Sequence, residues 1–320
     1  MATAAQRDRV HGMLTRHSDA VVRRSPDRQW HCRELVATCR LMLDRRALLS
    51  ALGFAALPRL AQAAPPASAW SRDLKSAARL IAGASTGSGG SLILSAGLEI
   101  TLEQGTKTYW RTPGDSGVPP HFDWSGSTNV AEVTVRWPAP MRFADGNGFS
   151  IGYKQAVILP LDILPRDPAL PVNLNLKLDY AVCEQICIPA KGEATLALTA
   201  GPAADPALND RIERSRDRVP MREFQGLGLA VTGIDHSGAR PVALLTAIVS
   251  ASDGTVDLFA EGPNSRWALP LPEALDNEGP VRRFKLDLDG VPRGADPLAQ
   301  PLTFTLVAGT RAIETTLTLR

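Results

Sequence analysis

The sequence is poor in cysteine, has almost no net charge and contains no long hydrophobic run. Only 4 of its 320 residues are cysteines, which excludes a small, disulfide-dense scaffold. With 35 Lys+Arg against 33 Asp+Glu, the formal charge of +2 gives no reason to expect a nucleic-acid partner. The 44% of hydrophobic residues excludes a wholly disordered chain. The length is sufficient for about two domains, each with its own core.

Signatures of several large enzyme classes are also absent. The sequence has no G-x-S-x-G or H-E-x-x-H motif, no P-loop and no dinucleotide fingerprint. The two histidines that follow residue 63, His121 and His236, fall in different predicted domains, so a serine or cysteine hydrolase triad is poorly supported. These patterns predict no cofactor and no metal site.

A targeting signal lies unusually far from the first residue. Arg45 and Arg46 precede an apolar run over 47–57, and Ala61-Gln-Ala63 follows as a small-x-small cleavage site. This order is typical of a secretory signal peptide. The apolar run is too short to span a bilayer, which takes about 20 residues. The paired arginines leave both the twin-arginine and the general secretory route open.

The position of this signal predicts where the protein starts. Met42 lies three residues before Arg45, so we expect residues 42–63 to be the signal peptide and residues 1–41 to come from a mis-called upstream start. Cleavage after Ala63 leaves 24 basic and 28 acidic residues, a net charge of −4, and two cysteines. No later stretch reaches a transmembrane length. The mature chain is therefore expected to be soluble and periplasmic.

Short alternating segments, separated by proline and glycine turns, fill residues 64–202. Leu98–Glu103 alternates, Gln104-Gly105 can turn, and Thr106–Arg111 returns, which predicts a hairpin. Further predicted strands cover 130–137, 153–161, 172–180 and 195–199. Several short strands of this kind predict a β-sandwich.

One helix is predicted between two β regions, within residues 203–220. Asp205 can cap its start and Pro206 suits its first turn. The residues with helical spacing on one face are Leu208, Ile212, Ser215 and Val219. Charges of alternating sign on the other face predict a solvated linker helix, with a partner-binding face as the alternative.

Strand signals resume after the helix and predict a second all-β domain over 221–320. The expected strands cover 227–234, 241–250, 255–260, 281–288, 302–307 and 312–319. This domain contains no cysteine. The predicted fold class is therefore all-β, with a sandwich over 64–202, a linker helix over 203–220 and a second sandwich.

The cysteines of the first domain stand four residues apart, as Cys183-Glu-Gln-Ile-Cys187. On one straight strand their Cα atoms are about 13 Å apart, whereas a disulfide needs roughly 4.4–6.8 Å. A three-residue turn places them opposite each other on adjacent strands, at about 4.5–5.5 Å. A helical turn also brings such residues together, but the alternating strand before them and Pro189 after them favour a β-hairpin tip.

The chemistry of this pair stays open from the residues alone. An exported protein is expected to form the bond. Closing so short a loop removes little entropy from the unfolded chain, so the bond is a weak stabiliser. The alternatives are a structural disulfide, a redox-active pair, or a Cu(I) site of two thiolates with Met141.

The stretch from Ala78 to Leu198 resembles the N-terminal periplasmic domain of the DsbD/ScsB family of membrane thiol:disulfide interchange proteins. The ScsB-like branch, which is linked to copper tolerance, is the most similar. The resemblance is carried by residues 78–81, 107–120, 122–127, 137–140, 152–154, 159–161 and 180–189. Residues 221–320 resemble the second domain of ScsB-like proteins.

The resemblance implies immunoglobulin-like sandwiches and a redox pair on a hairpin. Such domains take electrons from a thioredoxin-like domain and pass them to periplasmic substrate proteins. Cys187 matches the cysteine that forms mixed disulfides, and Cys183 matches the resolving thiol. The implied activity is that of a thiol:disulfide oxidoreductase of the protein-disulfide reductase type, and the implied partners are thioredoxin-like periplasmic proteins.

An aromatic cap loop shields the pair in well-studied family members. The corresponding stretch here is 143–149, so Phe143 and Phe149 are candidates for the shielding residue; the alternative is a glycine-rich surface turn with one buried phenylalanine. Tyr153 and Tyr180 are predicted to lie in the core or in a pocket wall. Glu184 disfavours a thiolate, and we expect no catalytic role for it.

The family's full-length members continue into a transmembrane electron conduit and a thioredoxin-like domain, whereas this sequence stops at Arg320. We therefore expect either a separate membrane partner that reduces the protein, or a changed role. The changed role is a non-catalytic interaction module in which the disulfide only holds the hairpin tip.

Overall fold

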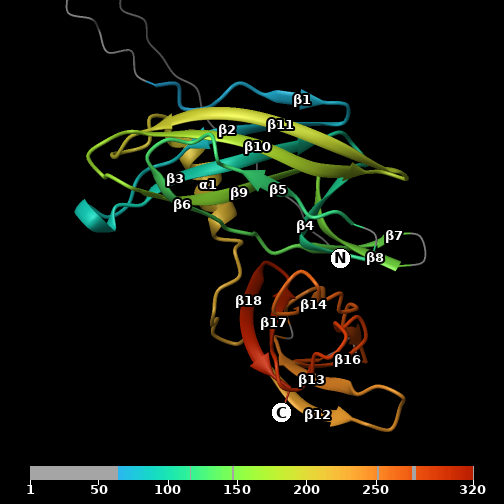
Figure 1. Cartoon of the computed structure of the whole chain (residues 1–320). Coiled ribbons are helices and arrows are strands. Elements are labelled where there is room, and N and C mark those ends of the chain that lie inside the picture. The colour runs from blue at the N-terminus through green and yellow to red at the C-terminus, as the bar shows by residue number, and fades with distance from the viewer. Residues whose placement is uncertain (1–63, 116, 146–147, 251, 276–278, 320) are drawn as a thin grey trace, which may run out of the picture. The chain divides into compact units, whose positions relative to one another are not determined.

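The computed structural model describes residues 64–115, 117–145, 148–250, 252–275 and 279–319, and it consists mostly of β-strands (Figure 1). The predicted signal peptide and the mis-called start lie outside the described residues. The all-β fold class is confirmed, because strands form four sheets and α1 is the single α-helix among the described residues.

The first two sheets come from the part of the chain before α1. One sheet has the order β1 (Ser71–Asp73), β2 (Ser76–Ala82), β3 (Leu94–Leu102), β9 (Ala156–Pro165), β6 (Val130–Val135). The other has the order β11 (Cys187–Leu198), β10 (Val172–Cys183), β4 (Lys107–Gly114), β8 (Gly148–Lys154), β7 (Met141–Asp145), and β5 (His121–Asp123) also pairs with β10. A short 3-10 turn, η1, covers Gly89–Ser91.

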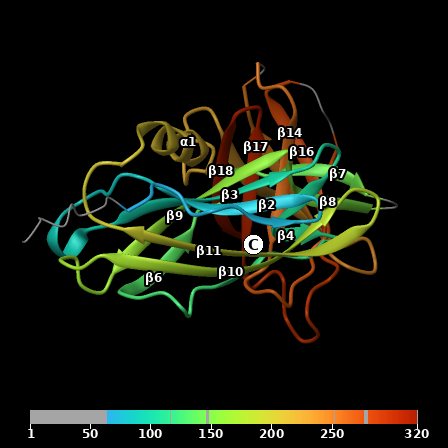
Figure 2. The ribbon, with the colours of Figure 1, turned by 90° about the horizontal axis from the view of Figure 1, so that it is seen from above.

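Alternating side chains of these two sheets form the first core. In β10, Leu174, Leu176 and Leu178 are buried, while the residues between them point outward or are half-buried. A strand whose alternate residues are apolar buries one face against the opposite sheet and leaves the other to solvent. The long β10–β11 hairpin, visible in Figure 2, belongs to this core.

The last two sheets form the second sandwich, most of whose buried hydrophobic residues form a second core cluster, except for Phe259, which packs in the first. The first has the order β12 (Gly228–Asp235), β13 (Val242–Ile248), β16 (Val281–Asp287), β15 (Glu273–Ala274). The second has the order β14 (Val256–Glu261), β17 (Pro301–Ala308), β18 (Arg311–Thr318). The six strands expected here from alternation are all present, while the domain boundaries at 202 and 221 stay a prediction.

The predicted hairpin between Leu98–Glu103 and Thr106–Arg111 is wrong. The two segments are β3 and β4, which belong to different sheets. β3 already pairs with β2 on one side and β9 on the other, so it has no free edge for β4. The turn at Gly105, which has a positive φ of 86°, therefore carries the chain across to the opposite sheet.

Helix α1 (Pro206–Arg216) begins as predicted. The Asp205 side chain accepts hydrogen bonds from the backbone N–H groups of Ala207 and Leu208, which otherwise lack a partner in the helix. Ile212 is fully buried.

The expectation of a solvated linker helix needs correction, because α1 packs against the first sandwich. It contacts β9, and two of its arginines make ion pairs with carboxylates of the sheet. Arg211 pairs with Glu99, and Arg216 pairs with Asp162. Alternating charges on a helix face do not reveal that the neighbouring sheet presents acidic partners.

Candidate functional site

The two cysteines form a disulfide at the tip of the β10–β11 hairpin. The strands pair without interruption from Val172 opposite Leu198 to Cys183 opposite Cys187. The turn between them consists of residues 184–186, and the two Cα atoms lie 4.1 Å apart. The hairpin-tip placement inferred from spacing is therefore confirmed.

The two cysteines differ sharply in exposure. Cys183 is only 1% exposed and packs in a small cluster with Tyr109 and Ala181. Cys187, on the other strand of the tip, is exposed. One sulfur of the pair is therefore open to attack by another protein, while its partner is protected.

Tyr109 of β4 contacts the exposed cysteine. Its hydroxyl oxygen lies 2.8 Å from Cys187 Sγ, and because a disulfide sulfur carries no proton, the tyrosine O–H is the donor. The residue is 2% exposed. Burial, together with the nearby Asp145 carboxylate, raises the pKa of Tyr109, so the hydroxyl stays protonated at neutral pH and remains a donor.

Strand β4 is held beside the cysteines by its pairing with β10. Thr108 stands opposite Val182, and its hydroxyl donates to the Ala181 carbonyl at 2.9 Å. Sequence reasoning did not identify Tyr109 as a site residue. Although the segment that contains it contributed to the family resemblance, only the sheet pairing brings it to a sulfur 78 positions later.

Lys107 stands opposite Cys183 and lies in a small charged group. Its Nζ is 3.1 Å from a carboxylate oxygen of Asp145, and both side chains are mostly buried. The ammonium groups of Lys107 and Lys154 lie 5.8 Å and 4.7 Å from the ring centroid of Phe143, within the range of a cation–π contact. Because Lys107 is already paired with a carboxylate, Tyr109 is the hydrogen-bond donor that acts directly on the exposed sulfur.

The two cap-loop candidates lie on neighbouring strands of the same sheet. Phe143 on β7 is 7% exposed, whereas Phe149 on β8 is 41% exposed. The residues between these strands, 146–147, are outside the described part of the chain. No contact of either ring with a cysteine sulfur is found in that part, so shielding of the disulfide stays a prediction.

Tyr153 and Tyr180 lie in the first core. The Tyr180 hydroxyl is 2.6 Å from Ser76 Oγ, and the Tyr153 hydroxyl donates to the Pro138 carbonyl at 2.8 Å. Burial raises the pKa of both phenols. Neither hydroxyl has a recorded contact with a cysteine, so the structure does not bring them into the disulfide site.

Glu184, in the turn of the hairpin, forms an ion pair with Lys75. The lysine offsets the negative charge that the carboxylate brings next to the cysteines. Beside this pair, Ile186 and Leu74 are each 77% exposed. The end of the hairpin therefore presents apolar surface next to the exposed sulfur.

The described residues around the cysteine pair bear on the Cu(I) alternative. They contain no group of three or more His, Cys, Asp or Glu side chains that could hold an ion. Met141 lies on β7, three strand positions from β10 in the sheet, which corresponds to about 14 Å at the usual strand spacing. It is therefore too distant to complete a Cu(I) site with the two cysteine sulfurs.

Comparison with known proteins finds one family that matches the part of the chain containing the cysteine pair. Residues 91–199 match the family described as the N-terminal part of the thiol:disulfide interchange protein DsbD. The matched part of the chain contains Cys183 and Cys187 and is similar to a DsbD N-terminal domain. A search of curated proteins finds no match to the sequence.

A solved structure shares the fold over most of the chain. The crystal structure of the N-terminal periplasmic domain of ScsB from Proteus mirabilis is similar, with a TM-score of 0.63 and 21% sequence identity. The match covers 79% of this chain and 98% of that one. Among the described residues, no helix is both long enough and apolar enough to cross a membrane.

Proposed function

We propose that the protein exchanges thiols and disulfides in the periplasm, passing electrons from a thioredoxin-like or membrane donor to substrate proteins. Cys187 is the attacking cysteine and Cys183 is the resolving one. The observation that carries this proposal is the asymmetry of the pair, with Cys187 exposed at a hairpin tip and Cys183 buried behind it.

The reaction balances as a transfer of two electrons. In the reduced protein, the Cys187 thiolate attacks a substrate disulfide, a bond forms between the two proteins, and the other substrate sulfur leaves as a thiolate that takes a proton from water. Cys183 then loses its proton and attacks Cys187 Sγ. The Cys183–Cys187 bond forms, and the second substrate sulfur is released as a thiolate. A dithiol of the donor later reduces this bond by the same two steps in reverse.

Tyr109 supports this chemistry from β4. Its protonated hydroxyl can donate to the Cys187 thiolate as it now donates to the disulfide sulfur. Because a hydrogen bond to the charged form favours that form, the contact lowers the pKa of the Cys187 thiol and raises the thiolate fraction. The same bond stabilises Cys187 as the leaving thiolate when a donor reduces the pair.

The surroundings of the tip suit a protein partner. Leu74 and Ile186, each 77% exposed, can be covered by a docking protein, and burial of apolar surface favours such association. Partners with a thioredoxin-like fold are those that the family implies. A separate membrane protein that supplies electrons belongs to the same proposal.

The proposal also includes the division of the chain into segments and its location in the cell. We assign the signal peptide to residues 42–63, the redox domain to 64–202, the linker to 203–220 and a second sandwich to 221–320. Export of the mature chain follows from the signal peptide, and membership in the ScsB-like, copper-tolerance branch follows from the sequence resemblance. The alternative is an interaction module with a purely structural disulfide.

Mixed-disulfide formation with a defined probe tests the assignment of the two cysteines. We expect Cys183→Ala to react with glutathione disulfide through Cys187 and to accumulate the adduct, which mass spectrometry detects. Cys187→Ala leaves only the buried thiol, so it should react far more slowly. Equal rates for the two variants would contradict the proposed roles.

The reduction potential of the wild-type pair separates exchange from a structural bond. Structural disulfides of exported proteins have potentials below about −300 mV. We expect a higher value, measured by equilibration with dithiothreitol buffers and alkylation of free thiols. A value below that limit would favour the interaction-module alternative.

A further inference from the structure

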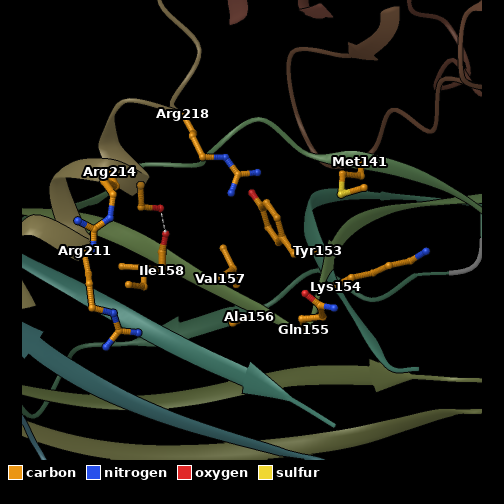
Figure 3. Close-up of a pocket in the computed structure, with 11 residues that line it drawn as sticks. Met141, Tyr153, Lys154, Gln155, Ala156, Val157, Ile158, Arg211, Arg214 and Arg218 are labelled. Atoms are coloured by element: carbon orange, nitrogen blue, oxygen red, sulfur yellow. Dashed lines mark hydrogen bonds between the residues drawn. The ribbon is translucent and has the colours of Figure 1, made fainter. Parts of the chain in front are cut away.

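A second concave site lies on the first sandwich, between α1 and the turn that joins β8 to β9. It has a volume of about 590 Å³ and is lined by eleven residues (Figure 3). The disulfide is not among its walls. Tyr153 and Val157, both buried, form part of its floor, and Met141 lies at one end.

The walls of this groove carry positive charge and no acidic side chain. Arg211, Arg214 and Arg218 line it on the helix side, and Lys154 lines it on the strand side (Figure 3). Arg211 is already paired with Glu99. Within the described part of the chain, no ion pair involves Arg214, Arg218 or Lys154, and the nearest recorded partner of Lys154 is the Phe143 ring.

The positive charge of Arg214, Arg218 and Lys154 does not reflect a generally basic chain. Residues 64–320 contain 24 basic and 28 acidic residues, so the chain that surrounds the groove is slightly acidic. The last turn of α1 can tolerate nearby cations, because carbonyl groups at the end of a helix carry partial negative charge. Because the protein around a cleft has a low dielectric constant, the positive electric field of the unpaired cations is concentrated in the groove.

The floor and the walls together define the class of ligand. Buried tyrosine and valine side chains can contact a carbon skeleton, while guanidinium groups bind carboxylate or phosphate oxygens in pairs. Cations on two opposite sides call for at least two acidic groups on one molecule. The volume lies within the range of about 300–1,000 Å³ found for small-molecule sites.

We propose that this groove binds a small organic anion with two or more acidic groups on an apolar body. Arg218, which points toward Tyr153 in Figure 3, holds one acidic group, and Arg214 adds positive charge to the same wall. Lys154 holds another acidic group, and Tyr153 and Val157 contact the carbon skeleton. The site is independent of the thiol chemistry, because none of its walls includes Cys183 or Cys187.

Calorimetric titration of the oxidised protein tests the site directly, with isophthalate as the probe in a phosphate-free buffer of low ionic strength. This probe carries two carboxylates on one aromatic ring. We expect saturable one-to-one binding that weakens as salt is added. Neutral isophthalamide, which has nearly the same shape, should not bind. Absence of isophthalate binding, or equal binding of isophthalamide or of inorganic phosphate, overturns the proposal.

Substitutions locate the binding. Arg214→Gln with Arg218→Gln should weaken isophthalate binding at least tenfold, and Lys154→Gln on the opposite wall should weaken it as a separate change. Arg266→Gln with Arg293→Gln removes the same charge from exposed positions of the second sandwich and should leave the affinity unchanged. Equal weakening by the control pair overturns the site. Because all these residues are exposed, unchanged thermal unfolding confirms that each variant is folded.

Discussion

The β10–β11 and β17–β18 hairpins are built alike, yet only the first ends in reactive groups. Each places its second strand at the edge of a sheet and pairs without interruption to its tip. The last pair is Cys183 with Cys187 in the first hairpin, and Ala308 with Arg311 in the second. The Arg311 guanidinium is tied to Asp253 by an ion pair.

The difference indicates that similar hairpins support different tips, and that the proposed chemistry depends on the residues at one of them. A fold of this kind accommodates many functions, because the site is a local feature carried by the scaffold. The first hairpin adds a second distinction, since β4 brings a buried hydroxyl to its exposed sulfur. Among the residues that the structure describes, no buried hydroxyl from another strand contacts the tip of the second hairpin.

The largest expected effect is on the rate of thiol–disulfide exchange, which should depend on the first hairpin tip and not on the second. Cys187→Ala should abolish thiol–disulfide exchange, because the attacking sulfur is lost and Cys183 is buried. Thr310→Ala, at the tip of the second hairpin, should leave the rate unchanged. The rate at which the reduced protein consumes glutathione disulfide measures both. Exchange that survives in Cys187→Ala would remove the functional contrast between the hairpins.

Truncation of a buried leucine should destabilise the two cores to a similar extent, even though the two hairpin tips differ. Leu174→Ala in β10 and Leu306→Ala in β17 each leave a cavity in a buried site, and each should lower the free energy of unfolding by about 2–5 kcal/mol. Urea unfolding followed by circular dichroism measures the loss. A loss of less than about 1 kcal/mol in either variant would show that the residue is not in a well-packed core.

Alkaline pH should weaken the first sandwich selectively. The three tyrosines of the sequence, Tyr109, Tyr153 and Tyr180, all lie there, and burial raises the pKa of each. Above the ordinary pKa of about 10, the unfolded chain loses phenolic protons that the folded chain keeps, so stability falls as pH rises. Each tyrosine contributes at most about 1.4 kcal/mol per pH unit.

Urea unfolding between about pH 9 and pH 11 measures this slope, and limited proteolysis with mass spectrometry shows where the chain opens first. Cleavage should begin in the first sandwich. Tyr180→Phe removes one buried phenol and should make the pH dependence less steep. Initial cleavage in the second sandwich, which contains no tyrosine, would contradict the prediction.

The smallest effect concerns the hydroxyl beside the exposed sulfur. Tyr109→Phe removes one hydrogen bond, worth about 1 kcal/mol, so the pKa of the Cys187 thiol should rise by somewhat less than one unit. Exchange near neutral pH should slow by roughly twofold to threefold, because the smaller thiolate fraction is partly offset by the higher nucleophilicity of a more basic thiolate. The pH dependence of alkylation by iodoacetamide in Cys183→Ala measures the thiol pKa.

Tyr180→Phe is the matched control for this substitution. It deletes the same kind of buried hydroxyl, but that hydroxyl is bonded to Ser76 rather than to a cysteine. The thiol pKa should not change in this variant. An equal shift in both variants would show that Tyr109 acts through general stability and not through its contact with the sulfur.

The sequence by itself determined the local features of this protein. Alternation located most strands, the Asp205-Pro206 pair marked the start of α1, and the spacing of Cys183 and Cys187 required a bend that proved to be a hairpin tip. These features depend on residues within a few positions of one another, so steric and hydrogen-bonding rules for short segments suffice to predict them.

Only the tertiary structure decided which distant segments meet. It placed β3 and β4 in different sheets, brought Tyr109 to Cys187, docked α1 on the first sandwich and placed four cations around one groove, of which only Arg211 is in an ion pair among the described residues. Each of these contacts joins residues that are far apart in the chain or belong to strands with more than one possible neighbour. Periodicity shows which face of a strand is apolar, but it does not identify the strand that packs beside it.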